Sequence, residues 1–422
     1  MQSYFLSECP EEPIGSIDVI KSYNRQEILG QNEGCLLALT CWNKSVKFYD
    51  LQIPYGASLN DNFKYNPSNE SIERSDELQN TSTSVQNTKY ISTGKCLQSL
   101  QCEYIYLACK FKNDSTIFFG GFNEAVDVIN LQDSLYSPRK LVGHLAPVRC
   151  LSLLENSSIL ASGDWNGEVL LTCVNKGSFG SQISKISLPG KVFCMDYSYN
   201  EEWLLVGDSL KNMNLINLKK LSSGIEATTP TEVVPNFMKY QLRNICANKH
   251  KDVFATSSIE GRVQITSVEK ALKGEVNSKE SPKDNYAFKC HRTKDNSMMT
   301  ETIYPVNSVC FHPQFANVLA TGGSDASVFL WDTSAKKRLW RNSNFQLVDS
   351  DKNLIRVCNE SISSLKFHPT LPYLISSCCD TFDQSCRLSS ETRDQANDGS
   401  NSIPVQRSSI IFHSVHGVKP LE

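Results

Sequence analysis

The sequence predicts an all-β fold, a closed ring of seven four-stranded blades that together form a β-propeller. Three observations predict it. A complete strand–turn–strand block lies between Phe311 and Trp340, weaker copies of this block recur along the chain, and the copies follow one another at roughly 40–50 residues. A single blade cannot bury both faces of its small sheet, so neighbours stacked around an axis are required.

The block FHPQFANVLATGGSDASVFLWD, residues 311–332, shows the pattern most completely. An apolar strand leads into a small-residue strand, a Gly-Gly-Ser-Asp turn follows, and an alternating strand ends at Trp331-Asp332. Alternation is typical of a half-buried β-strand, and Asp, Asn and Gly favour tight hairpin turns. We assign this block to blade six.

The other copies keep the same core with more substitutions. Each has a small-residue step, a turn residue such as Asn43, Asn123, Asn166 or Glu260, and then alternating apolar positions. Gly143-His144 and the Trp-Asp pair of blade six are the two halves of the WD-repeat pattern, so the chain resembles WD-repeat propellers. In chain order the copies end at Leu51, Leu131, Val174, Leu218 and Val268, and after blade six an interrupted copy runs from Leu371 to Asp380 and resumes as SSIIFHSV.

The chain is longer than seven blades require. Seven blades of about forty residues need roughly 280–320 residues, whereas the sequence has 422. The Asn-, Ser- and Thr-rich residues 54–93 are expected to form a disordered insertion between blades one and two. A second polar insertion at 381–402 splits the last blade, and a smaller one lies around residues 273–285. Residues 3–10 are expected to supply the outer strand of the last blade, so that 1–422 form one closed propeller.

Composition supports a folded core and indicates neither a nucleic-acid nor a membrane partner. The hydrophobic content is 40%, the net charge is −3, and we find no stretch of eighteen apolar residues and no signal-peptide pattern. We therefore expect a protein that neither spans a membrane nor is secreted through a cleaved signal. The sixteen cysteines, many on strand positions such as Cys41 and Cys150, are expected to be free thiols. Cys378, Cys379 and Cys386 lack metal-site spacing, so no metal is expected.

Catalytic motifs are absent from the sequence. It contains no Gly-x-Ser-x-Gly elbow, no His-Glu-x-x-His and no Walker loop. His312 and His368 lie in Phe-His-Pro turns, and His144 belongs to the repeat pattern. We therefore expect a docking platform that is not an enzyme and has no cofactor.

Blade topology predicts where partners dock. The turns between second and third strands, the starts of first strands and the ends of fourth strands lie on one face, called the top face below. Trp42 and Trp165 hold the position before the turn Asn in blades one and three, and Phe122 holds it in blade two. A single Trp would more often pack across neighbouring loops, but aromatics in three consecutive blades favour a binding site.

Blade five adds positive charge to the top face. Arg243 begins its first strand, Glu260 and Arg262 lie in its turn, and Lys289 and Arg292 end its fourth strand. The alternative is an ordinary solvated rim, which is less favoured because these cations flank strand ends. The cluster suits carboxylates or a phosphate, since each guanidinium offers paired donors. Arg243, Arg262 and Lys289 are expected to bracket a phosphate, while Glu260 accepts a donor that sets the register of the peptide.

Several strings resemble the spindle-checkpoint family of WD-repeat propellers, the mitotic-checkpoint proteins of kinetochores. They are SSIEGRV, YAFKCHR, YPVN, ATGGSD and KKRL, together with CWNKSVKFYD and LVGHLAPVRCL. The resemblance implies a nuclear, kinetochore-associated adaptor with a cytoplasmic pool, a monomer within a hetero-complex. Its implied partners are a checkpoint kinase and its pseudokinase relative, bound through an acidic segment, and a phosphothreonine motif of a kinetochore scaffold. The binding positions of the family match Trp42, Trp165, Arg243, Glu260, Arg262, Lys289 and Arg292.

Two alternatives remain. The mRNA-export propellers of the nuclear pore form a sister family that shares the Lys-Cys-His-Arg strand and is implied to hold an acidic nucleoporin segment on the same face. SVKFYD, GHLAPVRC, TGGSD and KKRL favour the checkpoint family. A generic scaffold in a ubiquitin ligase or chromatin complex is also possible, but it leaves the blade-five strings unexplained.

Overall fold

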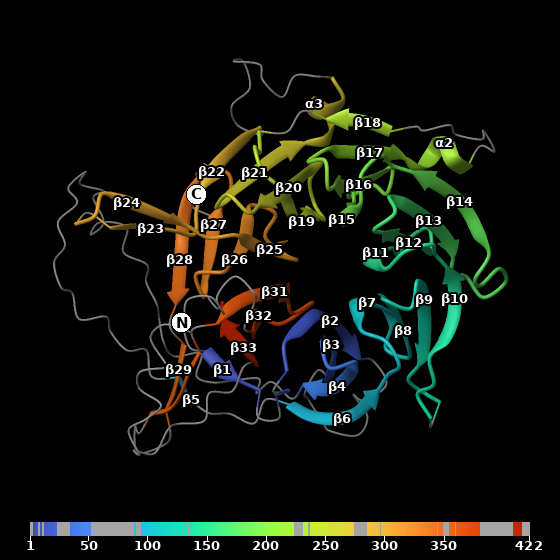
Figure 1. Ribbon diagram of the computed structural model, residues 1–422, viewed down its shortest axis with the longest axis horizontal. Helices are drawn as coiled ribbons and strands as arrows, with labels where there is room; N and C mark the ends of the chain where they lie inside the picture. The colour runs from blue at the N-terminus through green and yellow to red at the C-terminus, as the bar shows by residue number, and fades with distance from the viewer. Residues whose placement is uncertain are drawn as a thin grey trace.

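A computed structural model confirms the seven-bladed β-propeller. Seven four-stranded antiparallel sheets are arranged in a ring (Figure 1). The structure describes residues 3–6, 9–10, 12–22, 34–51, 88–89, 94–133, 135–222, 231–234, 237–273, 285–295, 297–343, 345–348, 354–358, 360–379 and 408–415.

The blades follow chain order. Blade one contains β2 (Ile14–Ser22), β3 (Gly34–Cys41), β4 (Ser45–Leu51) and β6 (Gly94–Gln101). Blade two contains β7 (Tyr106–Asn113), β8 (Thr116–Gly121), β9 (Ala125–Asn130) and β10 (Arg139–Gly143). Blade three contains β11 (Val148–Leu154), β12 (Ile159–Asp164), β13 (Glu168–Cys173) and β14 (Gln182–Ser187). Blade four contains β15 (Val192–Tyr197), β16 (Trp203–Asp208), β17 (Met213–Asn217) and β18 (Thr231–Val234).

The remaining blades have the same order. Blade five contains β19 (Leu242–Ala247), β20 (Val253–Ser258), β21 (Arg262–Ser267) and β22 (Tyr286–Lys289). Blade six contains β25 (Val306–Phe311), β26 (Val318–Gly323), β27 (Ser327–Asp332) and β28 (Lys337–Ser343). Blade seven contains β31 (Ser361–Phe367), β32 (Tyr373–Cys379), β33 (Ser408–Ser414) and β1 (Ser3–Phe5).

Blade seven closes the ring with strands from distant parts of the chain. β1 pairs antiparallel with β33, with Ser3 opposite His413, and becomes the outer strand of that sheet. The first strands of successive blades pack against one another, and β2 of blade one contacts both β7 and β31. The ring of first strands is therefore continuous (Figure 1).

The small-residue step of the repeat has a packing cause. A Cβ atom on Gly120 would lie 2.5 Å from Cγ1 of Val148 in the next blade. The corresponding contact of Gly163 is 2.6 Å to Val192, and that of Gly322 is 2.5 Å to Ile362. These distances are shorter than van der Waals contact, so the second strand must carry Gly where an aliphatic side chain of the neighbouring first strand packs. The recurring small residues of the second strands thus mark the positions at which neighbouring blades contact each other.

Cysteines contribute to the same packing. Cys41 and Cys310 are buried free thiols, and Cys150 is a partly buried one. Burial raises the pKa of Cys41 to about 11 and that of Cys150 to about 12, so both stay protonated at neutral pH. Cys386 lies outside the described residues.

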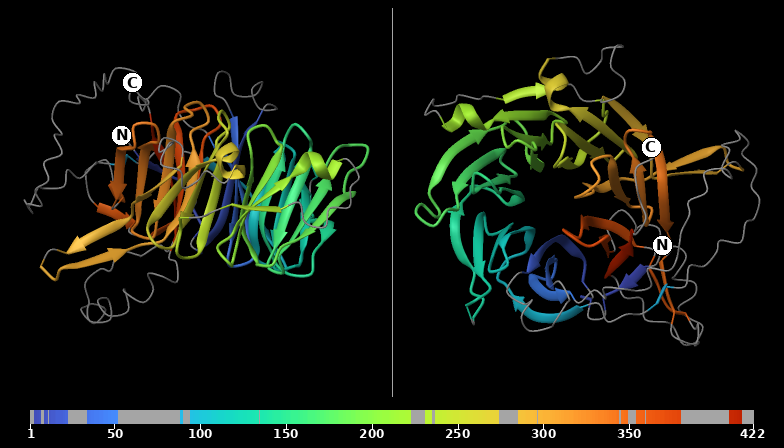
Figure 2. Two further views of the ribbon diagram at one scale, coloured as in Figure 1. Left: turned by 90° about the horizontal axis from the view of Figure 1, so that it is seen from above. Right: turned by 180° about the vertical axis from the view of Figure 1, so that it is seen from behind.

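Several elements lie outside the repeat pattern. Between blades five and six, β23 (Arg292–Asp295) and β24 (Thr300–Ile303) form a hairpin that projects from the ring (Figure 2). Between blades six and seven, β29 (Phe345–Val348) pairs with β30 (Leu354–Cys358) and, in parallel, with β5 (Thr88–Lys89). The short helices α2 (Leu218–Ser222) and α3 (Val268–Leu272) follow third strands. Apart from β5, the predicted insertions at 54–93 and 381–402 lie outside the described residues, as does most of 273–285. No helix within the described residues is long and apolar enough to cross a membrane.

Candidate functional site

One repeated hydrogen bond defines the top face. In six blades the backbone N–H of the residue after the second strand donates to the carbonyl of the residue before the first strand. The bond joins the second-to-third-strand turn to the start of the first strand, so these residues occupy equivalent places around the ring. The donors are Trp42, Phe122, Trp165, Ser209, Ile259 and Ser324.

Blades one to three carry aromatic side chains at this position. Trp42 is 49% exposed and Phe122 is 38% exposed. Trp165 is half-buried and packs edge-on against Phe122, with ring centroids 5.6 Å apart. The indole Nε1–H of Trp165 is buried and has no hydrogen-bond acceptor in the described part of the chain. The aromatic position therefore offers both apolar area and one unused donor.

Further exposed apolar side chains lie on the same face. Tyr104, Leu145 and Tyr240 lie just before β7, β11 and β19, and Leu210 lies in the turn between β16 and β17. Sequence reasoning missed these four, although their places before first strands or in a turn were a usable signal. They extend the exposed apolar area across blades one to five, well beyond scattered single residues.

Three of the predicted cations meet at one end of the blade-five sheet. Arg262 lies opposite Ser258 on one side and opposite Lys289 on the other. Arg243 occupies the irregularity of β19, next to Leu242, which itself lies opposite Ser258. Arg243 and Arg262 are half-buried and Lys289 is exposed. The ladder register therefore gathers Arg243, Arg262 and Lys289 at the top of blade five.

Arg292 lies elsewhere, and its expected place at the end of the fourth strand is wrong. β22 ends at Lys289, and Arg292 is the first residue of β23. His291 between them has φ of +50°, which ends the strand. The Arg292 guanidinium donates to the carbonyls of Glu260 (2.7 Å) and Gly261 (3.3 Å) and to Glu301 (2.9 Å). Arg292 thus fastens the hairpin to the turn of blade five.

Glu260 also contacts its own chain. Its side chain is nearly buried, and Oε1 accepts the backbone N–H of Lys239 at 3.1 Å. This bond holds the segment that leads through Tyr240 into Arg243. Its expected role as an acceptor for a partner stays a prediction.

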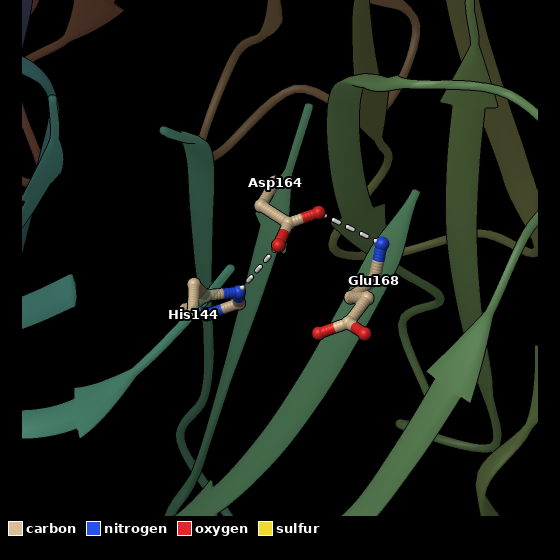
Figure 3. Close-up of side chains that lie close together, drawn as sticks. All are labelled: His144, Asp164 and Glu168. Carbon is tan, nitrogen blue, oxygen red and sulfur yellow. Dashed lines mark hydrogen bonds and ion pairs between the residues drawn. The ribbon is translucent and has the colours of Figure 1, made fainter. Parts of the chain in front are cut away.

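A buried histidine network stabilises each of two turns of this face. In blade three, His144 Nδ1–H donates to Asp164 at 3.1 Å (Figure 3). Its Nε2 accepts from Ser162 at 2.8 Å. Burial raises the Asp164 pKa, but the bonds from His144 and from the backbone of Glu168 and Asn166 outweigh it and lower the pKa. Asp164 therefore stays ionised in the core.

Blade six has a fuller network, which sequence reasoning missed. His291 bonds Asp325 (2.7 Å) and Thr321 (2.9 Å), and the Trp331 indole donates to Thr321 (3.0 Å). The histidine arrives from the end of blade five, so the bond also joins two blades.

The only group of potential metal ligands in the described residues is His144, Asp164 and Glu168. The dashed lines of Figure 3 show that Asp164 is already bonded to His144 and to the backbone of Glu168. The Glu168 carboxylate pairs with Lys185. Because these donor atoms are engaged, the group fits a structural network better than a metal site.

The chain is similar to known WD-repeat proteins. The family model for the WD domain, G-beta repeat, matches residues 136–171, from the end of blade two through most of blade three, and residues 297–332, which include the first three strands of blade six. Mitotic checkpoint protein bub-3 of Caenorhabditis elegans is 31% identical over 262 residues, 62% of this chain and 67% of that protein. The chain belongs to the mitotic checkpoint family of WD-repeat propellers.

Other members and a sister family are similar as well. Spindle assembly checkpoint protein bub3 of Schizosaccharomyces pombe is 28% identical over 235 residues, 55% of this chain and 66% of that protein. Poly(A)+ RNA export protein of the same yeast is 27% identical over 252 residues, 59% of this chain and 64% of that protein. This chain thus spans slightly less than two thirds of these two relatives. Membership of the mitotic checkpoint family supports a role for this chain as a WD-repeat adaptor of the spindle checkpoint.

Proposed function

We propose that this mitotic checkpoint family member holds a short acidic segment of a checkpoint kinase, or of its pseudokinase relative, on the top face. The observation that carries the proposal is the convergence of Arg243, Arg262 and Lys289 at one end of blade five. Carboxylates suit this cluster because two half-buried guanidinium groups provide forked donors. The aromatic side chains of blades one to three provide apolar area for the remainder of the segment.

The same cluster is proposed to read a phosphothreonine motif of a kinetochore scaffold. A phosphothreonine carries nearly two negative charges and three acceptor oxygens, which cations from three different strand ends can surround. Partly buried pairs are screened less than exposed ones, so added salt should weaken binding only moderately. Arg292 contributes by holding the turn in place, since its guanidinium is bonded to Glu260 and Gly261.

The location follows from this role. Family membership supports a nuclear protein that acts at kinetochores. We further propose that it is a monomer within a hetero-complex and has a cytoplasmic pool. Neither a nucleic acid nor a membrane is proposed as a direct partner.

Titration calorimetry with paired peptides tests the proposal. A kinetochore-scaffold peptide with phosphothreonine should bind at least about tenfold more tightly than its unmodified form, the equivalent of about 1.4 kcal/mol. Arg262→Glu should remove this preference. Equal affinities would exclude the phosphate reader and leave an adaptor for acidic segments.

An mRNA-export role is the second candidate, and the similarity to the yeast Poly(A)+ RNA export protein favours it. In that case the top face would hold an acidic nucleoporin segment. Affinity purification from dividing cells distinguishes the two roles. Checkpoint kinases in the eluate support the first, and nucleoporins with export factors support the second.

A further inference from the structure

The face opposite the candidate site contains a cavity of about 460 Å³. The far ends of the first strands of blades one to three form much of it, with residues 18–21 of β2, 110–113 of β7 and Leu153 of β11. Ser158 and Val174 of blade three and Pro369 of blade seven complete the wall. Because top-face residues begin the same first strands, the cavity and the candidate site lie at opposite ends of the blades. A volume of this size is typical of ligand pockets.

Asp18 in the cavity wall is already neutralised. It is 3% exposed, and its Oδ2 accepts the backbone N–H of Phe111 at 2.9 Å and lies 3.4 Å from Lys110 Nζ. Its Oδ1 lies 3.7 Å from Lys366 Nζ in blade seven. Asp18 therefore has two cationic neighbours and no surplus negative charge for the other lysines of the cavity.

Lys112 has no comparable counterion. Its Nζ donates to the carbonyl of Val174 at 2.5 Å and lies 5.4 Å from the centroid of the Phe179 ring. Within the described residues, no carboxylate lies within salt-bridge distance of Lys112 or of Lys176 in the adjoining turn. Burial, followed by the charge of Lys176, lowers the pKa of Lys112. Lys112 thus lines the cavity without a salt-bridge partner, and Lys176 lies two residues after Val174, whose carbonyl Lys112 contacts.

Apolar groups accompany this charge. Val19, Ile20, Val174 and Pro369 line the cavity, and Phe179 beside Lys112 is 44% exposed. Glu155, which also lines the cavity, would repel a ligand of high negative charge. The cavity therefore suits one or two carboxylates joined to apolar groups better than a polyphosphate.

We propose that this cavity binds an acidic peptide segment in which a carboxylate lies next to an apolar side chain. The carboxylate pairs with Lys112 and Lys176, and the apolar side chain packs on Val19, Ile20 and the exposed ring of Phe179. The site is independent of the proposed function, because it lies at the other end of the blades. The protein can then hold two segments at once, one on each face.

Fluorescence anisotropy with a labelled hexapeptide, Gly-Glu-Phe-Glu-Leu-Gly, tests this inference on the full chain. Lys112→Glu and Lys176→Glu should each weaken binding about tenfold or more, because each replaces attraction by repulsion. Lys176 is exposed, so its substitution leaves the fold intact even if Lys112→Glu disturbs the Val174 contact. All variants are compared in the Arg262→Glu background, in which the proposed top-face site cannot take the peptide. Lys140→Glu, on the exposed outer strand of blade two, is the matched control and should bind normally.

Two further ligands test whether the carboxylates of the peptide are recognised. A peptide with Gln in place of both Glu residues should bind about tenfold more weakly, and inorganic phosphate should displace the labelled peptide only at far higher concentration than unlabelled peptide does. Absence of binding to the unaltered protein, equal weakening by Lys140→Glu, or displacement by phosphate and peptide at equal concentration would each overturn the inference. Loss of binding in Arg262→Glu would assign the peptide to the top face instead.

Discussion

Arg262 and Lys289 lie directly opposite each other in the ladder between β21 and β22. Directly opposed side chains share one face of a sheet, and like charges there are destabilising. The fold thus carries a local repulsion at the end of blade five that a bound anion would relieve. The register of the β21–β22 ladder therefore favours a negatively charged ligand at this end of blade five.

We expect Arg262→Glu to abolish binding of the acidic or phosphorylated peptide on the top face. Removing one partner of a desolvated charge pair weakens the binding free energy by about 2–5 kcal/mol, and the new carboxylate also repels the peptide. The melting temperature should stay constant or rise slightly, since the new Glu faces Lys289. Calorimetry and thermal melts measure both effects, with Lys337→Glu on the outer strand of blade six as the control. Normal peptide binding by Arg262→Glu would place the site elsewhere.

We expect Trp42→Ala to weaken binding of the same peptide by about 2 kcal/mol if the indole is a buried anchor in the complex. Tyr199→Ala is a suitable control, because Tyr199 is 50% exposed, like Trp42 at 49%, but lies in the turn after β15, at the opposite end of its blade. Comparable losses in both variants would mean that general surface change, not the aromatic position, weakens the peptide.

We expect Arg292→Ala to release the β23–β24 hairpin. Three hydrogen-bond partners of the guanidinium disappear, so amide hydrogen exchange across residues 292–303 should rise at least about tenfold. Exchange in β20 and β21 should change little. Mass spectrometry of peptic fragments measures this exchange. Unchanged exchange in the hairpin would show that the β23–β24 ladder holds it without Arg292.

Stability should fall as the pH is lowered from about 6.5 toward 4. Burial, followed by the charge of His250, lowers the pKa of His312 from 6.5 to about 4. Between these values the unfolded chain binds more protons than the folded one, so the free energy of unfolding decreases, by on the order of 2–3 kcal/mol. His312 Nδ1 also accepts the backbone N–H groups of Gln314 and Phe315, and a protonated Nδ1 cannot accept these bonds.

His312→Asn provides the matched test of this pH dependence. Asn248 has an equivalent role in blade five, where its Oδ1 accepts the N–H groups of His250 and Lys251 at 2.8 and 3.2 Å. The variant should keep the turn and lose part of the acid sensitivity in urea titrations at pH 7, 6 and 5. The remainder should come from groups such as His413, whose pKa burial lowers to about 3. A slope identical to that of the unaltered protein would contradict the assignment.

The ring itself could be predicted from the sequence because the contacts between blades require particular residue types at regular intervals along the chain. The Gly residues of the second strands are required by neighbouring aliphatic side chains, and the turn residues by tight hairpins. Trp42 and Trp165 were found through the same periodicity, and the structure puts them in equivalent hydrogen-bonded positions.

The features that sequence reasoning missed depend on contacts between distant residues. His291 binds Asp325, 34 residues further on, and no local pattern reveals that pairing. The misplaced Arg292 has a related cause, since a positive φ at a histidine cannot be read from YAFKCHR. The cavity around Lys112 needs four blades, so it exists only in the assembled ring.

The pairing of β1 with β33 has a consequence for how the molecule reaches its native state. Ser3 and His413 are about 400 residues apart along the chain, yet they share one ladder. Contacts of such long separation form late and slowly. During synthesis the earlier blades can fold on their neighbours, but the final sheet must wait for β33, and blade one keeps an uncovered flank until then. We therefore expect ring closure to be the slow step of folding and the stage most open to capture by chaperones or to aggregation.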